Sequence, residues 1–471
     1  MNGPTNATNS ESPTGVRYRV LGFACTLSMI TYLDRACFGA AAPSIASELG
    51  LTDVSQLKWA MTAFAIAYAV FEIPAGAMGD RLGPRMMLIR IVTWWSVCTA
   101  LTAVIGLRVG GTVIGGLGTL IALRFLFGAG EAGAYPNITR AIHNWFPPRS
   151  WEMSQGMVFM AGRVMGGLTP LLWAILVGGT AETAPLMGWR PAFLLFGGIG
   201  LIWTVAFARW FRNRPEEHPG INAAERDLIG SHEHARSLHG AIPWRGLFTS
   251  RSLWALCLMY FLVNYAWAFN LTYLPTYLQE RFSIETGDRL GAIYKGAPLW
   301  LGAAGCFLGG FCINGLARVL GDRRRARQVL GFTALSAGAL CWWGARHAEN
   351  VQTFCLLISL AAFGIDLTLG AAWATCQDLG RQHAAVTAAC MNTIGTLGSA
   401  MAVWLTGTLV ERSLTLQVAL QHNSLAQLSA VDRHVAVLSG YDAAFATYVV
   451  VFLLASCCWP LIDPSTPISA D

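Results

Sequence analysis

Two charged residues stand side by side in the first long apolar stretch of the chain. Asp34 and Arg35 lie within residues 20–42, and about 20 apolar residues suffice for a helix to cross a bilayer. A charged side chain at mid-membrane is unfavourable, so it usually faces a bundle interior or an aqueous cavity. Neighbouring residues on a helix point in different directions. We therefore expect one charge to bind a ligand and the other to carry a proton, unless both belong to buried structural ion pairs.

A second pair of charges, Arg124 and Glu131, lies in a later apolar stretch. Seven residues make two helical turns, so both side chains share one face, about 10.5 Å apart along the axis. That is too far for direct contact in a straight helix, but a substrate or water chain can bridge it. A carboxylate that moves between an apolar site and a cation changes its proton affinity. Glu131 is thus either a proton carrier or a static partner of an arginine.

Further polar residues of the apolar stretches extend this set. Arg163 suits a carboxylate, because a guanidinium binds it through two parallel hydrogen bonds and stays charged when buried. It is either a site for a second acidic group of a substrate or a partner of Asp34 or Glu72. Tyr68 and Glu72 are one helical turn apart and share a face. Asp366 is as consistent with a structural role as with a functional one.

The composition indicates a membrane protein. Of the 471 residues, 54% are hydrophobic and 12% are charged, whereas a soluble domain has about 25% charged residues. The basic residues behind the net charge of +6 lie mainly between apolar segments, so they predict orientation signals rather than nucleic-acid binding. We predict an all-α protein of twelve transmembrane helices, at about 18–42, 57–79, 86–106, 112–138, 152–178, 190–210, 252–278, 291–316, 328–346, 351–374, 383–410 and 441–462.

A long polar stretch divides these segments into six and six. We predict five parts, which are an N-terminal tail 1–17, a six-helix bundle 18–210, a central cytoplasmic loop 211–251, a second bundle 252–462 and a C-terminal tail 463–471. Most of the 32 Lys and Arg residues fall in loops on the side that holds both termini, which predicts cytoplasmic termini. At 411–440 we expect a long outside loop or a short surface helix.

A motif recurs nearly half a chain apart. The first copy, 76–85, contains Gly76, Asp80, Arg81, Gly83 and Arg85. The second begins at Gly310 and has Asn314 in place of the aspartate. Tandem repeats of this kind are typical of transporters, whose substrate site lies at the midplane between the repeats. We expect the first copy to form a cytoplasmic gate, and the Asn314 copy to form a weaker one.

The first copy resembles the signature loop of the major facilitator superfamily. Further stretches resemble its anion:cation symporter family, namely Tyr32-Leu-Asp34-Arg35, 63–74, 124–136, 373–378 and 391–398. The resemblance covers about 18–462. It implies uptake of hexuronates, aldonates, glucarate or related organic anions.

The residue types and the resemblance together predict roles for single residues, although Asp366 has no clear counterpart in the family. The predicted substrate-binding residues are Arg35, Tyr68, Arg163, Trp373 and Asn392, the proton-coupling residues are Asp34, Glu131 and Arg124, and Glu72 and Asp366 are further candidates. Arg163 and Glu72 depart from the family, where uncharged polar residues are usual, so substrate or coupling can differ. Trp373 is equally consistent with packing.

We predict a multi-pass protein of the cell membrane that imports a small organic anion, of the sugar-acid class, by proton-coupled symport and alternating access. An exchanger of the same fold is the alternative, and a membrane receptor or enzyme is a remote one. The expected partners are the anion and the lipid bilayer, with no nucleic acid. We expect a monomer with no cofactor and no metal, driven by a proton gradient, although sodium can replace the proton.

Overall fold

The structure is a computed structural model that describes residues 12–51, 57–109, 112–178, 185–230, 242–284, 289–421 and 429–468. Within these residues the chain is helical apart from one antiparallel pair, β1 (Leu107–Val109) and β2 (Thr112–Ile114). Long helices are the expected solution for an apolar chain in a bilayer, because a helix satisfies its own backbone hydrogen bonds.

The first helix group, α1 to α7, precedes a polar stretch. Its members are α1 (Val16–Glu48), α2 (Lys58–Leu82), α3 (Pro84–Thr102), α4 (Leu117–Glu131), α5 (Ala134–Trp145), α6 (Trp151–Trp173) and α7 (Trp189–Trp210). Gly83 ends α2 with a φ of 85°, and Gly133 separates α4 from α5 with a φ of 84°. Both values favour glycine. Pro84 then begins α3, at a position where its missing N–H costs no intrahelical bond.

The second helix group, α10 to α16, follows the short helices α8 (Ala223–Ile229) and α9 (Trp244–Thr249). Its members are α10 (Arg251–Thr272), α11 (Leu274–Phe282), α12 (Arg289–Leu320), α13 (Arg323–Arg346), α14 (Val351–Gly380), α15 (Ala384–Gln421) and α16 (Ala430–Cys458). Short 3-10 turns lie at Pro148–Ser150, Pro215–Glu217, Arg381–His383 and Trp459–Leu461, and a π-helical turn lies at Ala174–Gly178.

The predicted apolar segments fall on these helices, with two corrections. Eight helical stretches of the described chain are long and apolar enough to cross a membrane, one of which combines α14 with α15. The start of segment 112–138 is wrong, because Thr112–Ile114 is β2 and the helix begins at Leu117. The described part of 411–440 is neither a loop nor a separate short helix, because α15 continues to Gln421 and α16 begins at Ala430, while 422–428 lie outside the described residues.

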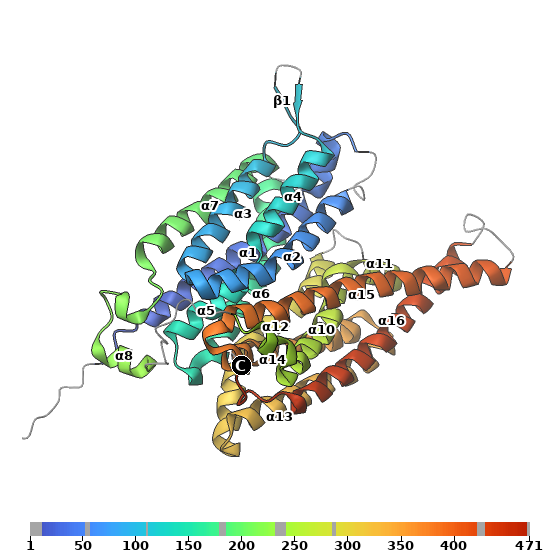
Figure 1. The fold of residues 1–471 in the computed structure, drawn as a ribbon. Helices are drawn as coiled ribbons and strands as arrows, with labels where there is room; N and C mark the ends of the chain where they lie inside the picture. Colours follow the sequence, from blue (N-terminus) through green and yellow to red (C-terminus); the bar gives the residue numbers. More distant parts are fainter. Residues whose placement is uncertain are drawn as a thin grey trace, which may run out of the picture.

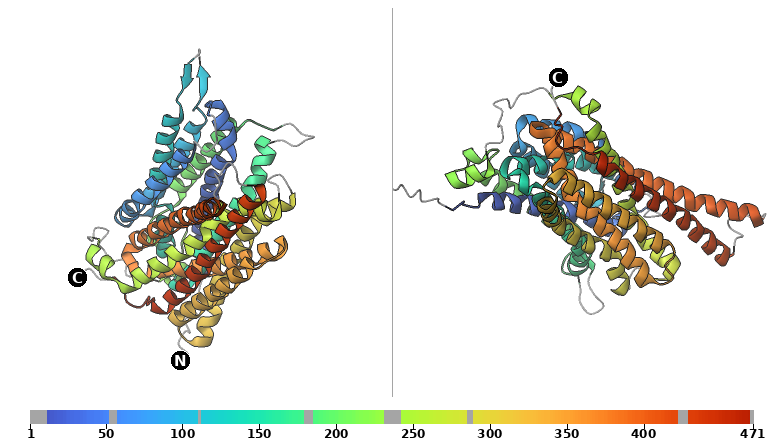
Figure 2. Two further views of the ribbon diagram at one scale, coloured as in Figure 1. Left: turned by 90° about the vertical axis from the view of Figure 1, so that its right-hand side faces the viewer. Right: turned by 90° about the horizontal axis from the view of Figure 1, so that it is seen from below.

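Each helix group packs mainly within itself (Figures 1 and 2). In the first group α1 contacts α6, α2 contacts α4, and α3 contacts α7. In the second group α12 contacts α14, α10 contacts α15, and α13 contacts α16. The two groups meet chiefly where α2 and α5 contact α15, and where α6 contacts α12 and α14.

One helix pair extends past the rest of the second group. With 38 residues, α15 is about 57 Å long, which exceeds the roughly 40–45 Å of a bilayer with its head groups. The far ends of α15 and α16 project together on the right of Figure 1. Several apolar side chains on these ends are exposed, including those of Leu416, Leu420 and Val431.

The polar stretch between the groups is anchored to the start of α1. Glu225 of α8 accepts hydrogen bonds from the backbone N–H groups of Val16 at 2.9 Å and Arg17 at 3.1 Å. Its carboxylate is also bound by the Thr14 hydroxyl and the Arg17 guanidinium. Burial raises the pKa of Glu225, but these hydrogen bonds and the Arg17 charge outweigh burial and hold that pKa below its ordinary value.

Candidate functional site

Arg35 of α1 reaches Glu131 of α4. Its Nε donates to Glu131 Oε1 at 2.7 Å. The guanidinium also lies 4.8 Å from the ring centre of Tyr68 on α2. The Arg35 side chain is 35% exposed and that of Glu131 only 2%, so the cation is open to a ligand while the carboxylate is enclosed. Glu131 therefore contacts Arg35, not the Arg124 that shares its helix.

Asp34 forms no ion pair with Arg35, as expected for neighbours on a helix, although Glu131 interacts with both. It is 4% exposed, and neither carboxylate oxygen has a hydrogen-bond partner among the described residues. Arg124 and Glu131 are close enough to act on it electrostatically. The Arg124 guanidinium lies 4.2 Å from the ring centre of Phe38 and 4.6 Å from that of Phe127. This region thus holds buried charges with unused hydrogen-bonding capacity.

Glu72 joins α2 to α15. Asn392 Nδ2 donates to Glu72 Oε1 at 2.5 Å and to the Tyr68 hydroxyl at 3.4 Å. Thr393 Oγ1 donates to Glu72 Oε2 at 3.4 Å. Tyr68 and Glu72 therefore do share a face, and both meet the same amide of the second helix group. The arrangement places three predicted residues, Tyr68, Glu72 and Asn392, in one contact.

Arg163 of α6 pairs with Asp366 of α14. Nε and Nη2 of Arg163 donate to the two carboxylate oxygens at 2.9 and 3.0 Å. Its Nη1 donates to the Tyr32 hydroxyl at 2.5 Å. The alternative in which Arg163 pairs with Asp34 or Glu72 is therefore wrong, because its carboxylate partner is Asp366. The contact joins the two helix groups.

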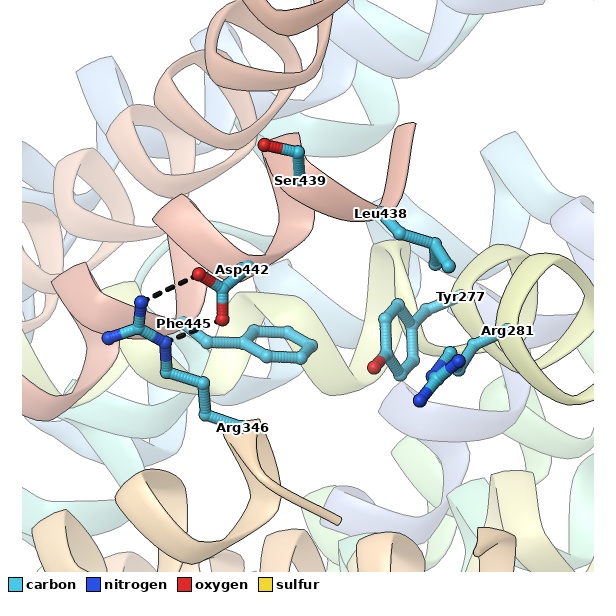
Figure 3. Close-up of a pocket in the computed structure, with 7 residues that line it drawn as sticks. All are labelled: Tyr277, Arg281, Arg346, Leu438, Ser439, Asp442 and Phe445. Carbon is cyan, nitrogen blue, oxygen red and sulfur yellow. Dashed lines mark hydrogen bonds and ion pairs between the residues drawn. The ribbon is translucent and has the colours of Figure 1, made fainter. Parts of the chain in front are cut away.

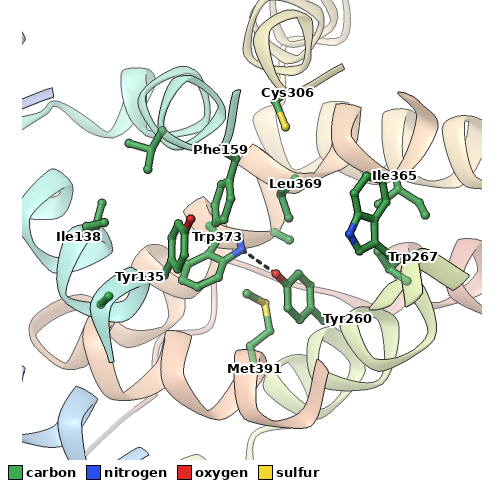
Figure 4. Packing of buried hydrophobic residues seen from close by; sticks show 14 of the residues in the cluster. Tyr135, Ile138, Phe159, Tyr260, Trp267, Cys306, Ile365, Leu369, Trp373 and Met391 are labelled. Atoms are coloured by element: carbon green, nitrogen blue, oxygen red, sulfur yellow. Dashed lines mark hydrogen bonds between the residues drawn. The ribbon is translucent and has the colours of Figure 1, made fainter. Parts of the chain in front are cut away.

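Trp373 lies inside an aromatic cluster (Figure 4). Its side chain is fully buried, and Nε1 donates to the Tyr260 hydroxyl at 3.2 Å. The indole lies 5.1 Å from the ring centre of Phe159 and 6.0 Å from that of Tyr135. These rings come from both helix groups. Trp373 is therefore a packing residue in this conformation, and contact with a substrate would require the helices to move.

Gly76 and Asp80 of the first motif contact the start of α15. Asp80 accepts hydrogen bonds from the backbone N–H groups of Ala385 at 3.1 Å and Val386 at 2.8 Å. A carboxylate is favoured there by the positive end of the helix dipole. A Cβ on Gly76 would lie 2.8 Å from the Ala385 carbonyl oxygen, so this close approach needs glycine.

The rest of the motif lies elsewhere. The backbone N–H of Arg85 donates to Asn213 Oδ1 at 2.9 Å, and its Nη2 donates to the Ala208 carbonyl at 2.5 Å. Gly83 also packs against Asn213, and Arg81 is exposed. Only Gly76 and Asp80 therefore join the two helix groups, whereas Gly83 and Arg85 stabilise the end of α7.

The second copy of the motif contributes to a cluster that the sequence did not reveal. Arg323 donates to the two oxygens of Glu152 at 2.8 and 2.6 Å and to Asn314 Oδ1 at 3.0 Å. Arg327 donates to Glu152 at 2.8 Å and to Asp378 at 2.5 Å. Glu152 of α6 supplies the carboxylate that the second copy lacks at Asn314, and the weaker gate stays a prediction. The only sequence signal was an acidic residue at the start of an apolar segment.

A surface pocket is lined by none of these residues (Figure 3). It is lined by Tyr277, Arg281, Arg346, Leu438, Ser439, Asp442 and Phe445. Arg346 and Asp442 are joined by two hydrogen bonds of 2.5 and 2.6 Å. The lining comes entirely from the second helix group and includes no predicted site residue. Within the described ranges, no group of three or more His, Cys, Asp and Glu residues is arranged to hold a metal ion.

Comparison with known proteins places the chain among transporters. Residues 24–403 match the Major Facilitator Superfamily. The probable sulfoacetate transporter SauU of Cupriavidus necator is 32% identical, over 84% of this chain and 88% of its own length. The hexuronate transporter of Bacillus subtilis is 27% identical, over 85% and 89% respectively. The solved structure of the proton:xylose symporter XylE covers 96% of this chain and 97% of its own, with a TM-score of 0.71 and 12% identity, so this likeness concerns the fold alone.

Proposed function

Since this chain belongs to the Major Facilitator Superfamily, we propose that it imports a small organic anion together with a proton. The chain is a transporter and not an enzyme, and it is a multi-pass protein of the plasma membrane. Its relatives carry names that specify sulfoacetate and hexuronate. These names support an organic anion of the sugar-acid class or a similarly small acid as substrate.

The single observation behind the proposal is the charge arrangement around Arg35. Arg35 is open on one side, while Glu131 holds it with one oxygen and leaves the other, Oε2, without a partner among the described residues. Asp34 has no hydrogen-bond partner there either. A substrate carboxylate can take the Arg35 guanidinium, and Glu131 then needs a proton, because an unpaired buried carboxylate is strongly disfavoured. Anion binding and proton binding are thereby linked.

The membrane topology is part of the proposal. We assign twelve spans to α1, α2, α3, α4 with α5, α6, α7, α10 with α11, α12, α13, α14, α15 and α16. The two helix groups then correspond to bundles 18–210 and 252–462, with both termini and the 211–251 loop in the cytoplasm. An engineered cysteine in this loop is expected to resist an impermeant thiol reagent added to intact cells. Labelling from outside would contradict the topology.

Alternating access is supported by where the groups touch. The described polar contacts between the groups involve Asp80, Arg140, Glu152, Arg163 and Glu72, and run from mid-span to the ends that carry the repeated motif. In the proposed topology these ends are cytoplasmic. The structure then corresponds to a state closed toward the cytoplasm. Transport requires these contacts to break and the groups to rock about the site.

The test of coupling uses Glu131→Gln, which mimics the protonated carboxylate. Purified protein in proteoliposomes is assayed for counterflow and for accumulation driven by a pH gradient. The variant is expected to keep counterflow, because the anion site is intact, and to lose uphill accumulation. Glu216→Gln, at an exposed position, serves as the control and should behave like wild type.

Two outcomes would contradict the proposal. If Glu131→Gln still concentrates substrate on a proton gradient, the proton is carried elsewhere, with Asp34, Glu72 and Asp366 as the remaining acids. If wild type shows counterflow but responds to neither a proton nor a sodium gradient, the chain is an exchanger. If uptake responds to a sodium gradient alone, sodium and not a proton is the coupling ion.

A further inference from the structure

The Arg163–Asp366 ion pair is unusual in two respects. Every guanidinium nitrogen has a partner, and the pair lies where the two helix groups meet. All three guanidinium nitrogens of Arg163 donate hydrogen bonds, two of them to Asp366 and one to the Tyr32 hydroxyl. The guanidinium also lies 3.8 Å from the ring centre of Trp267 on α10. The side chains are 8% and 0% exposed. Four helices, α1, α6, α10 and α14, therefore converge on one cation.

This geometry matches the way a guanidinium binds a ligand. Arginine binds a free carboxylate through two parallel N–H···O bonds, which is how Asp366 occupies Arg163. The ring of Trp267 stacks on the Arg163 guanidinium, and the Tyr32 hydroxyl accepts its third hydrogen bond. Both contacts hold this planar cation in place for an anion. Asp366 thus stands where the acidic group of a small molecule would fit.

The second cation, Arg35, lies on the same helix as Tyr32, three residues further along α1, and the Tyr32 hydroxyl accepts a hydrogen bond from Arg163 at 2.5 Å. Arg35 and Arg163 both act electrostatically on the hydroxyl groups of Tyr32 and Tyr135. Arg35 is held by Glu131 and is a third exposed, whereas Arg163 is enclosed. The protein therefore presents two guanidinium groups near the same tyrosines, each neutralised by a carboxylate of the chain. Two cations with exchangeable partners suit a ligand with two acidic groups.

The geometry points to a small dianion as the substrate, whose first acidic group binds Arg35 and whose second displaces Asp366 from Arg163. This inference rests on the proposed function, because it assumes that Arg35 binds the transported anion. Asp366 is then a stand-in that neutralises Arg163 while the site is empty. Its displacement also breaks the ion pair between α14 and α6, so occupancy of the second site removes one polar contact between the two helix groups.

The displaced carboxylate must be neutralised. The charged and titratable groups that act on Asp366 are Arg163 of α6, Tyr32 of α1 and Cys306 of α12. Once the dianion has taken Arg163, neither Tyr32 nor Cys306 supplies a positive charge, and an unpaired buried carboxylate is strongly unfavourable. Asp366 therefore takes up one proton from the aqueous side when the dianion binds, and returns it when the dianion leaves.

The experiment measures binding to the purified full-length protein by calorimetry. Sulfoacetate and D-glucarate are the dianionic probes, and D-galactonate is the monoanionic probe. Arg163→Gln is expected to lose about 10- to 100-fold in affinity for the dianion, as for loss of charged hydrogen bonds, and to bind galactonate within about threefold of wild type. Asp366→Asn is expected to bind the dianion more tightly than wild type, because a neutral amide competes less well for Arg163.

Calorimetry in buffers of different ionisation enthalpy supplies the second readout. Wild type should take up one more proton per bound dianion than Asp366→Asn does. The matched control is Asp442→Asn, which removes the carboxylate from the Arg346–Asp442 pair, a two-bond pair inside the second helix group. It should change neither affinity nor proton uptake. If Arg163→Gln does not fold, the dianion affinity of Arg163→Lys and the affinity and proton uptake of Asp366→Asn test the inference instead.

The outcomes separate two failures. If wild type binds galactonate and a dianion equally, and Arg163→Gln changes neither, then Arg163–Asp366 is a permanent structural pair and the inference is overturned. Dianion binding with equal proton uptake in wild type and Asp366→Asn also overturns it. If wild type binds a probe and Arg35→Ala binds that probe with equal affinity, the proposed anion site itself fails.

Discussion

The mid-span charges around Arg35 differ from those near the repeated motif and from the fully paired Arg163 and Asp366. Around Arg35, Asp34 has no hydrogen-bond partner among the described residues and Glu131 uses only one oxygen. Near the motif, Glu152 receives bonds from Arg323 and Arg327 on both oxygens. The first region has buried charged groups with unpaired hydrogen-bonding atoms, whereas both carboxylate oxygens of Glu152 in the second region accept hydrogen bonds.

This difference indicates that one region serves transport and the other stabilises the fold. A buried polar group without a partner is unfavourable, so Asp34 and Glu131 destabilise the empty protein unless a ligand or a proton completes them. The Glu152 cluster saturates its charges within the protein, and removing one member leaves an uncompensated charge. We therefore expect mutations around Arg35 to change transport more than stability, and mutations of the Glu152 cluster to do the reverse.

The largest expected effect on stability is that of Glu152→Gln. It leaves Arg323 and Arg327 without their shared carboxylate, and loss of one partner of a buried pair costs about 3–5 kcal/mol. The thermal unfolding midpoint of the purified protein should fall clearly. Asp442→Asn is the control, because its pair with Arg346 is more exposed and worth about 0–1 kcal/mol. Equal unfolding midpoints for Glu152→Gln and wild type would remove the contrast between the two regions.

Arg35→Lys tests the mid-span region by binding. An ammonium group cannot reproduce the planar fork that binds a carboxylate through two bonds. Loss of charged hydrogen bonds of about 1.5–3 kcal/mol corresponds to roughly 10- to 100-fold weaker binding. Calorimetry with the substrate anion measures it, with Arg346→Lys as the control outside the site. A variant with wild-type affinity would show that Arg163 or Arg124 binds the anion instead.

Glu225 gives a smaller effect that depends on pH. Its pKa is held below the ordinary value of 4.5, so its stabilising contribution is complete above pH 4.5 and is lost as the pH falls through the lower folded value. Glu225→Gln should lower stability at neutral pH by about 0.5–2 kcal/mol, as for loss of a helix cap. The difference from wild type should vanish in acid. A difference that persists well below pH 4 would mean that the effect is steric.

Asp34→Asn is expected to have the smallest effect on stability. Since Asp34 has no hydrogen bond to lose among the described residues, its unfolding midpoint should stay close to that of wild type, while gradient-driven uptake in proteoliposomes should fall. A large loss of stability would place Asp34 with the Glu152 cluster. Normal uptake would show that it carries no proton.

Several local features could be predicted from the sequence. Asp34 and Arg35 do not pair with each other, and Tyr68 and Glu72 do meet one partner, because helical geometry fixes the directions of nearby side chains. The apolar segments likewise predicted where most helices lie. The errors at 112–138 and 411–440 arose where apolar content failed to mark a strand, and where the polar ends of α15 and α16 still form helix.

Pairing across the chain could not be predicted. Arg163 and Asp366 are far apart in sequence, as are Glu152 and Arg323. No local pattern indicates which face of α6 meets α14. Even the first motif divided unexpectedly, since Gly76 and Asp80 contact α15 while Arg85 contacts the end of α7. Such contacts depend on how whole helices pack. Glycine positions allow helices to approach closely, but they do not determine which helices meet.

The sequence by itself determined the membrane environment, most of the helices and the types of charge buried in them, because hydropathy and helix formation depend on residues close together in the chain. Only the tertiary structure decided which charges neutralise one another. Electrostatic energy depends on distances of a few ångströms, and those distances arise when helices distant in sequence pack together. That packing leaves Arg35 half-open, encloses Arg163 with Asp366 and saturates Glu152.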